Sequence, residues 1–276
     1  YLVPVDGMPD RIVVDVKNGA GEPANKTASK KPGTTPKTKD KATAMAASAR
    51  PPARIRPAEA KQQIIVAIDP GHGGKDPGTL GKYNLREKDI ALDISRRVAR
   101  KINEKSGFKA VMTRDSDVYL NLVERTRIAK KQNADIFVSI HLNSAPRRSA
   151  RGVELFLISP AGAEATAKKF LSNRNNAAKE LGLDAPESDD IMHMLVDVNQ
   201  QAMMQRSLLL GEEILKAMNR KDLPPVRSVN QKSVAVLKSV DIPSVLVEAG
   251  FLTNSKDASI FKKSNGRQAA ADGIAD

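Results

Sequence analysis

Two histidines and one glutamate closely follow three apolar runs that have the length and composition of β-strands. The three pairs are residues 64–69 with His72, residues 136–140 with His141, and residues 245–247 with Glu248. In open α/β sheets, ligands bind beyond the carboxyl ends of the strands, where loops vary while the sheet stays fixed. The sequence therefore predicts that two imidazoles and a carboxylate face one crevice.

The two histidines are candidates for a metal site. The chain has three histidines and no cysteine, so a metal would be held by imidazole and carboxylate groups. Neutral imidazole suits zinc, and a catalytic zinc takes three protein ligands and keeps one open position. Glu87 begins a predicted helix after the His72 loop and would hang over the same crevice. His72, Glu87 and His141 would then form the kind of ligand set that metallohydrolases use.

Each of these residues also has a structural interpretation. A histidine at a strand end is often only hydrogen-bonded within the fold. Asn84, three residues before Glu87, makes a capping-box pattern, and the local sequence alone favours that role for the glutamate. Glu248 could instead cap a turn at Gly250. His193 lies between two methionines and is interpreted as a residue on the surface or at the core edge of a helix.

The elements that would position these side chains alternate between strand-like and helix-like segments. The predicted strands are 64–68, 108–113, 135–140, 152–158, 233–237 and 244–247. The predicted helices are 87–105, 120–132, 161–181, 191–219 and 255 to the end. This alternation predicts an α/β fold with a single twisted, mostly parallel sheet flanked by helices.

The formal net charge of +13 is concentrated in one segment of the 276-residue chain. Residues 17–61 hold eleven Lys and Arg against three acidic residues, with six of the sixteen prolines and no apolar periodicity. We interpret them as a disordered basic linker. The β-branched run 11–16 indicates that residues 1–16 end an upstream domain, and residues 62–276 are predicted to form the main folded domain.

Composition argues against two classes of function. The 17–61 segment carries +8, which leaves only +5 for the rest of the chain, while aromatic residues make up 3% and Trp is absent. Both observations disfavour binding to nucleic acid. No uncharged apolar run approaches the roughly 20 residues that cross a bilayer, so we expect no transmembrane segment.

The motifs at the strand ends resemble those of the zinc-dependent N-acetylmuramoyl-L-alanine amidases that cut peptidoglycan. They are residues 68–74 (IDPGHGG), 76–78 (DPG), 86–89 (REKD), 113–114 (TR), 124–126 (ERT), 139–143 (SIHLN) and 243–251 (PSVLVEAGF). The resemblance covers about residues 64–275 and implies that His72, Glu87 and His141 bind zinc, which overturns the capping interpretation of Glu87. It also implies that Glu248 is the catalytic carboxylate. The bond cut would join the lactyl group of N-acetylmuramic acid to the first alanine of the stem peptide, for wall remodelling or daughter-cell separation.

The resemblance implies further parts that act around the catalytic domain. Amidases of the cell-separation type carry an envelope-targeting (AMIN) domain, a linker, and a helical insertion near the active site that can plug the zinc site until a partner removes it. Residues 1–16 and about 161–204 stand at the corresponding places. We therefore expect an activator protein that acts on the insertion. The expected location is the periplasm or cell envelope, with an export signal outside this chain.

Two positions near these motifs are less clearly assigned. Where a plug glutamate would align, this chain has Asn173, Asn175 and Asn176, and Glu180 is the next acidic residue, which puts direct capping of zinc by a carboxylate in doubt. Asn143, two residues beyond His141, could bind substrate or simply end its strand.

Two other functions share these residues. A non-enzymatic peptidoglycan-binding or regulatory module could keep the fold, but it would need no proton-transferring group such as Glu248. Another zinc amide hydrolase, such as a carboxypeptidase, would share the chemistry and differ in the bond that breaks.

Overall fold

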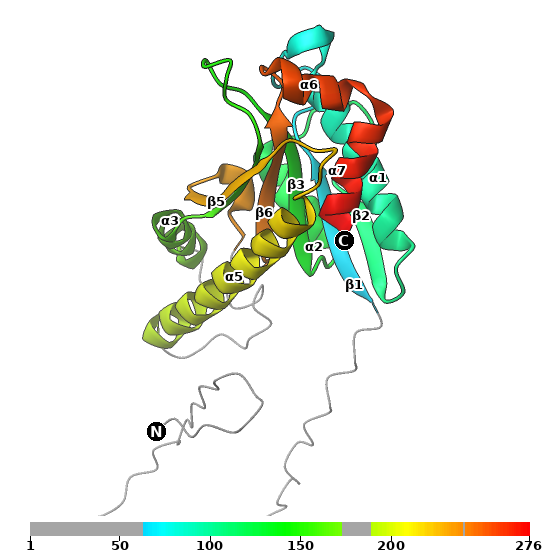
Figure 1. Ribbon diagram of the computed structural model, residues 1–276. Helices are drawn as coiled ribbons and strands as arrows, with labels where there is room; N and C mark the ends of the chain where they lie inside the picture. Colours follow the sequence, from blue (N-terminus) through cyan, green and yellow to red (C-terminus); the bar gives the residue numbers. More distant parts are fainter. Residues whose placement is uncertain (1–62, 173–188, 240) are drawn as a thin grey trace, which may run out of the picture. The chain divides into compact units, whose positions relative to one another are not determined.

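A six-stranded mixed sheet runs through the part of the chain that the computed structural model describes, residues 63–172, 189–239 and 241–276 (Figure 1). The strands are β1 Ile64–Pro70, β2 Phe108–Met112, β3 Ile136–Asn143, β4 Val153–Ile158, β5 Val226–Lys232 and β6 Ser244–Phe251. Their order is β2-β1-β3-β6-β4-β5, and every neighbouring pair is parallel except β4 with β6. The predicted α/β fold with a mostly parallel sheet is confirmed. Residues 1–62, which include the predicted linker and upstream domain end, lie outside the described residues.

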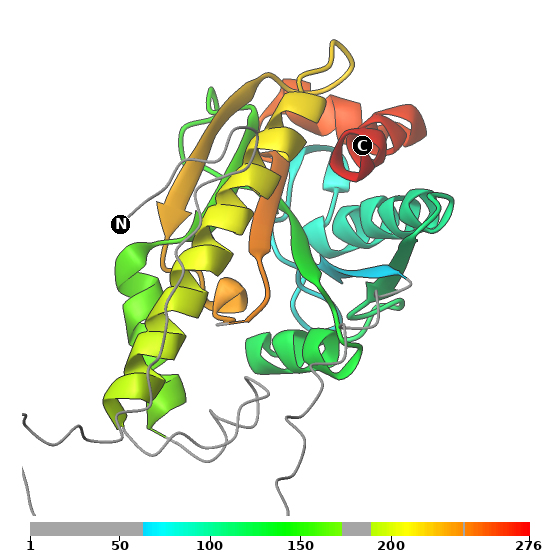
Figure 2. The same cartoon turned by 90° about the horizontal axis from the view of Figure 1, so that it is seen from below.

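Helices cover both faces of the sheet (Figure 2). They are α1 Glu87–Asn103, α2 Leu122–Lys131, α3 Pro160–Leu171, α5 Asp189–Ala217, α6 Ser255–Lys262 and α7 Ser264–Ala275, with short 3₁₀ turns η1 Lys82–Asn84 and η2 Ala235–Leu237. The helix predicted at residues 87–105 is confirmed as α1, and its apolar residues spaced four apart, Ile90, Ile94, Val98 and Ile102, are all buried. Within the described ranges, no helix is both long and apolar enough to cross a membrane.

The alternation of side chains along each strand decides which residues join the core and which reach the site. Val138 and Ile140 of β3 face the larger apolar cluster, which contains residues of α1, α5 and α7. Phe137 faces the opposite cluster, built with residues of α2 and η2. Ser139 and His141 follow Phe137 at intervals of two and therefore lie on the α2 side of the sheet.

The strand predicted at residues 233–237 is wrong. The structure has β5 at Val226–Lys232, and residues 235–237 form η2. The apolar side chains of Val236 and Leu237 pack with Ala129 of α2 beneath the site instead of joining the sheet. Residues 233–237 are mostly apolar because they cover one face of the sheet, whereas β5 is an edge strand with a largely polar sequence.

The predicted insertion, about 161–204, is described only at its two ends. β4 runs antiparallel to β6, with Glu154 opposite Glu248 and Phe156 opposite Leu246. β4 therefore ends level with the start of β6, and α3 begins there. The side chain of Gln200 on α5 donates to the carbonyl of Ala163 on α3 at 2.7 Å, so the two helices are joined. Residues 173–188, with the asparagines and Glu180 at the expected plug position, lie outside the described residues.

Candidate metal centre and active site

The sheet register places His141 and Glu248 side by side. They are paired residues of the neighbouring parallel strands β3 and β6, so their side chains project from the same face. Neighbouring strands lie about 4.8 Å apart, which makes these two groups adjacent. Gly71 follows β1 on the other side of His141, and a Cβ there would lie 2.3 Å from Cε1 of the imidazole. The predicted meeting of strand ends is confirmed. Position 71 requires glycine because the imidazole ring of His141 occupies the space that a side chain there would fill.

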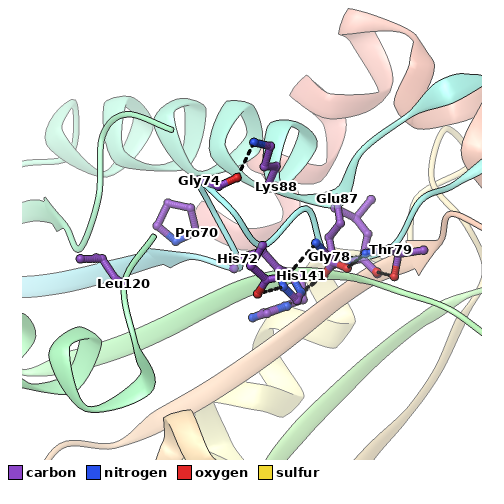
Figure 3. Close-up of polar contacts among 12 residues, drawn as sticks. Pro70, His72, Gly74, Gly78, Thr79, Glu87, Lys88, Leu120 and His141 are labelled. Carbon is purple, nitrogen blue, oxygen red and sulfur yellow. Dashed lines mark hydrogen bonds and ion pairs between the residues drawn. The ribbon is translucent and has the colours of Figure 1, made fainter. Parts of the chain in front are cut away.

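Three potential metal-binding groups converge at this edge: His72, Glu87 and His141 (Figure 3). One carboxylate oxygen of Glu87, Oε1, lies 3.1 Å from Nε2 of His72 and 3.0 Å from Nδ1 of His141. One ligand atom from each residue lies within 4.8 Å of the others. The two imidazole rings are 5.0 Å apart and nearly perpendicular, at 77°. Two nitrogen donors and one carboxylate oxygen thus point at a common centre, which is an arrangement that can hold a metal ion.

Glu87 is fixed by backbone N–H groups rather than by a helix cap. It is the first residue of α1, and the N-cap is Arg86, whose side chain makes no capping bond. The Glu87 carboxylate accepts hydrogen bonds from the backbone N–H of Thr79 at 2.8 Å and of Leu142 at 3.1 Å. Burial alone would raise its pKa, but hydrogen bonds with His141 and His72 outweigh burial and hold the pKa of Glu87 well below its usual range. The prediction of a capping box with Asn84 is wrong. The Glu87 carboxylate is instead ionised and points at the two imidazoles.

His72 is oriented by an acidic neighbour. Asp76 Oδ2 lies 2.8 Å from Nδ1 of His72, which leaves Nε2 facing Glu87. Although burial favours the neutral ring, hydrogen bonds with Glu87 and Asp76 raise the pKa of His72 to about 9. The His72 backbone takes a left-handed φ of 56°, and Gly78 turns at φ 62° where a Cβ would meet the His72 ring and the Glu87 carboxylate. A carboxylate behind an imidazole in this way orients metal-binding histidines in proteins.

Two buried arginines hold the loop that carries His72. The guanidinium of Arg114 donates to the carbonyls of Pro70 and Gly71, and that of Arg125 donates to the carbonyls of Pro70 and His72. Arg125 also pairs with the fully buried Asp69 at 2.9 Å. Three consecutive loop carbonyls therefore have charged donors, which fixes the position of His72 relative to the sheet.

The role of this arginine pair in the site could not be predicted from the sequence. Arg114 and Arg125 appeared only inside the motifs TR and ERT, and nothing in an isolated arginine shows that it will be buried. The available signal was their position directly after a strand and at the start of a helix, both next to the predicted crevice.

Glu248 differs in its environment from Glu87. Its Oε2 atom is shielded from solvent and has no hydrogen-bond partner within the described part of the chain. Burial raises the pKa of Glu248 to about 7, an effect that the charge of His141 only partly offsets. The capping role at Gly250 has no support, since β6 continues through that residue. A carboxylate with a free oxygen and a pKa near neutrality is suited to accept and return a proton.

The remaining candidate residues lie outside the cluster. The Asn143 side chain donates to Glu154 at 2.9 Å and accepts from the backbone N–H of Ser144, so both ends of its amide are engaged within the fold. Glu154 lies on β4 directly opposite Glu248 on β6, and its carboxylate also forms an ion pair with Arg227 at an N–O distance of 2.9 Å. His193 is exposed on α5, as predicted for a surface position.

Comparison with known proteins gives one consistent result. A family described as N-acetylmuramoyl-L-alanine amidase matches residues 66–276. The chain is 36% identical to N-acetylmuramoyl-L-alanine amidase AmiC of Escherichia coli O6:H1 over 229 residues, covering 81% of this chain and 55% of AmiC. It therefore spans about half the length of that relative.

Solved structures show the same fold. N-acetylmuramoyl-L-alanine amidase AmiC2 of Nostoc punctiforme aligns with a TM-score of 0.57 at 29% identity, over 77% of this chain and 93% of AmiC2. The CwlD amidase of Clostridioides difficile, solved in complex with the GerS lipoprotein, aligns with a TM-score of 0.54 at 25% identity, over 77% and 95% of the two chains.

Proposed function

Because the chain belongs to the N-acetylmuramoyl-L-alanine amidase family, we propose that it is a zinc-dependent hydrolase of peptidoglycan. The bond cleaved is the amide between the lactyl group of N-acetylmuramic acid and the first L-alanine of the stem peptide. The observation that carries the proposal is the convergence of His72, Glu87 and His141 beside Glu248, whose Oε2 atom has no hydrogen-bond partner among the described residues.

The donor set fits zinc better than the other common ions. Two imidazoles and one carboxylate form a three-ligand set known from zinc hydrolases, and the carboxylate is already ionised. Calcium and magnesium prefer sites made of oxygen atoms alone. Bound zinc would supply Lewis acidity, which polarises a carbonyl group and lowers the pKa of water.

Glu248 performs the proton transfers in this proposal. Its free Oε2 accepts a proton from the attacking water and then returns it to the amide nitrogen, which leaves as the amine of L-alanine. The neighbouring β-strands fix Glu248 beside His141, so the base and the ligand set keep their relative positions during turnover. Asp76 and the Arg114 and Arg125 pair act earlier, by holding His72 in the orientation that binds metal.

Digestion of purified sacculi with and without a chelator tests the function. We expect the chain to release free stem peptides and to leave glycan strands with intact lactyl groups, as read by mass spectrometry. Treatment with a strong chelator should abolish release, and about one equivalent of Zn²⁺ should restore it.

The alternatives predict other products. A carboxypeptidase would release single terminal amino acids, and a binding module would release nothing. Activity that survives complete removal of metal would contradict the zinc assignment.

We extend the proposal to the organisation and location of the protein. Residues 62–276 form the catalytic domain, residues 17–61 a linker, and residues 1–16 the end of an envelope-targeting domain. The start of the family match at residue 66 supports the first boundary. Peptidoglycan lies outside the cytoplasmic membrane, so the protein belongs in the periplasm or cell envelope, which fractionation of the source cells tests.

A partner protein acting on the insertion is the second part of the proposal. The CwlD amidase was solved in complex with the GerS lipoprotein, and this supports the proposal that an amidase of this fold can have a protein partner. On this chain, Met194 and Val198 lie four residues apart on α5 and are each 62% exposed. Positions four apart share one face of a helix, so they present an apolar surface on the described part of the insertion.

Paired substitutions test this surface. An envelope extract from the source organism should stimulate the purified chain several-fold. Met194→Glu combined with Val198→Glu should remove the stimulation and leave basal hydrolysis as it was. Leu209→Glu is the matched control, because Leu209 is also exposed on α5 but lies outside residues 161–204. Equal stimulation of the double variant and the control would refute the assignment.

A further inference from the structure

An ion pair outside the metal-binding cluster holds the middle of the loop that carries His72. The ammonium group of Lys88 on α1 donates to the carbonyl oxygen of Gly74 at 2.8 Å and to Oδ2 of Asp117 at 2.6 Å. The other carboxylate oxygen of Asp117, Oδ1, accepts a hydrogen bond from the backbone N–H of Gly74 at 2.7 Å. Both backbone polar groups of Gly74 are therefore bound by one ion pair, and Figure 3 shows the Lys88 side chain directed at the carbonyl.

This ion pair connects the segments that carry two of the candidate metal ligands. Gly74 lies between His72 and Asp76, the residue whose carboxylate orients the His72 ring. Lys88 directly follows Glu87 in the first turn of α1. The bond from Lys88 to Gly74 thus joins the helix end that presents the Glu87 carboxylate to the loop that presents the His72 imidazole.

The burial of Lys88 favours a positioning role over a stabilising one. The Lys88 side chain is 9% exposed and that of Asp117 is 49% exposed. Removal of an ammonium group from water costs free energy, which a half-exposed partner recovers only in part, so an apolar side chain of similar volume would often serve stability equally well. The ammonium group adds direction, because its hydrogen bonds fix the loop relative to α1 at a defined distance.

Resting on the proposed zinc-dependent function, we propose that Lys88 and Asp117 are positioning residues that hold His72 at the correct distance from Glu87 and thereby raise the affinity for zinc. Neither residue lines the pocket of about 320 Å³ beside the metal-binding cluster, which supports a role without contact to substrate. Groups that orient metal ligands from behind typically change metal affinity by about 10- to 100-fold when they are removed. Because this ion pair acts through the backbone of the loop, we expect an effect at the lower end of that range.

Zinc dissociation constants, measured by competition with a chelator of known affinity, provide the test. We expect Lys88→Met and Asp117→Ala each to raise the zinc dissociation constant by about 10-fold. The double variant should show little more than the larger single effect, because the two residues hold Gly74 as one unit. Methionine keeps the apolar stem of the lysine side chain, and Asp117 is half-exposed, so both variants should fold. The zinc concentration that gives half-maximal hydrolysis of sacculi should rise by the same factor.

Lys101→Met is the matched control. Lys101 lies on the same helix and pairs with Asp272 at 3.0 Å, but this ion pair joins α1 to α7 and not to the loop. The control variant should lose an ion pair of α1 and keep the wild-type zinc dissociation constant. Unchanged zinc affinity in Lys88→Met and Asp117→Ala, or an equal rise in Lys101→Met, would overturn the inference.

The same measurements separate this inference from the proposed function. A wild type that binds zinc but releases no stem peptides contradicts the amidase function, while the zinc dissociation constants still decide the role of Lys88 and Asp117. A wild type that binds no zinc contradicts both.

Discussion

Replacement of Glu248 by glutamine is expected to lower peptidoglycan hydrolysis by about 100-fold or more while metal content stays the same. Glutamine keeps the shape of the side chain and can still form hydrogen bonds, but it cannot accept a proton from water. Glu248 is not among the three residues that converge on the candidate metal centre, so the ligand set should remain intact. Release of stem peptides from sacculi, together with metal analysis of the purified variant, measures both quantities.

Glu154→Gln is the matched control for this result. Glu154 lies directly opposite Glu248 on β4 and projects from the same face, but it is tied to Asn143 and Arg227. Its variant should retain activity within about 10-fold, since removal of a half-exposed ion pair has a small effect. Near wild-type turnover of Glu248→Gln, or an equal loss in the two variants, would show that Glu248 is not the proton acceptor.

The arrangement of the site follows largely from features visible in the sequence. The apolar runs before His72, His141 and Glu248 fix both their strands and the edge of the sheet at which they end. Alternation along a strand then decides the face, which is why Ser139 and His141 share a side. Those two rules predict that the three side chains meet at one edge of the sheet, whereas the position of His72 within its loop also depends on Arg114 and Arg125.

The role of Glu87 could not be decided from local sequence. An acidic residue in the first turn of a helix is expected both for a capping box and for a ligand presented by a helix N-terminus. What separates the two is a set of contacts with distant segments, namely the N–H groups of Thr79 and Leu142 and the imidazole of His141, 54 residues away. The resemblance to the amidases supplied that information, and the geometry agrees with it.

The errors have a physical cause in common. Within the described part of the chain, β5 pairs with β4 alone, at the edge of the sheet, so its residues need not be apolar. η2 is apolar because it packs over α2. Burial of Arg114 and Arg125 likewise depends on loop carbonyls that become neighbours only in the folded chain. Hydropathy reports how much a segment is covered, and it does not report which element covers it.

Removal of a predicted ligand should have the largest effect of all, because it acts on the metal itself. We expect the wild type to purify with roughly one equivalent of zinc, and His141→Ala and His72→Ala to purify with far less and to lose activity in parallel. The two remaining donors cannot complete the three-ligand set, and Glu87 keeps a negative charge in a buried position with one imidazole fewer to balance it. Metal analysis and sacculus digestion on the same preparations measure the two losses together.

His193→Ala provides the matched control, since His193 is the third histidine of the chain and is exposed on α5, outside the metal-binding cluster. It should bind zinc and cleave sacculi like the wild type. Circular dichroism separates loss of metal from loss of fold, because the sheet beneath His141 is held by apolar contacts on both faces that do not involve the imidazole. A folded His141→Ala variant that keeps a full equivalent of zinc would show that His141 is not a ligand, and the Nδ1 atom beside Glu87 would then have only the structural role of a hydrogen-bond partner.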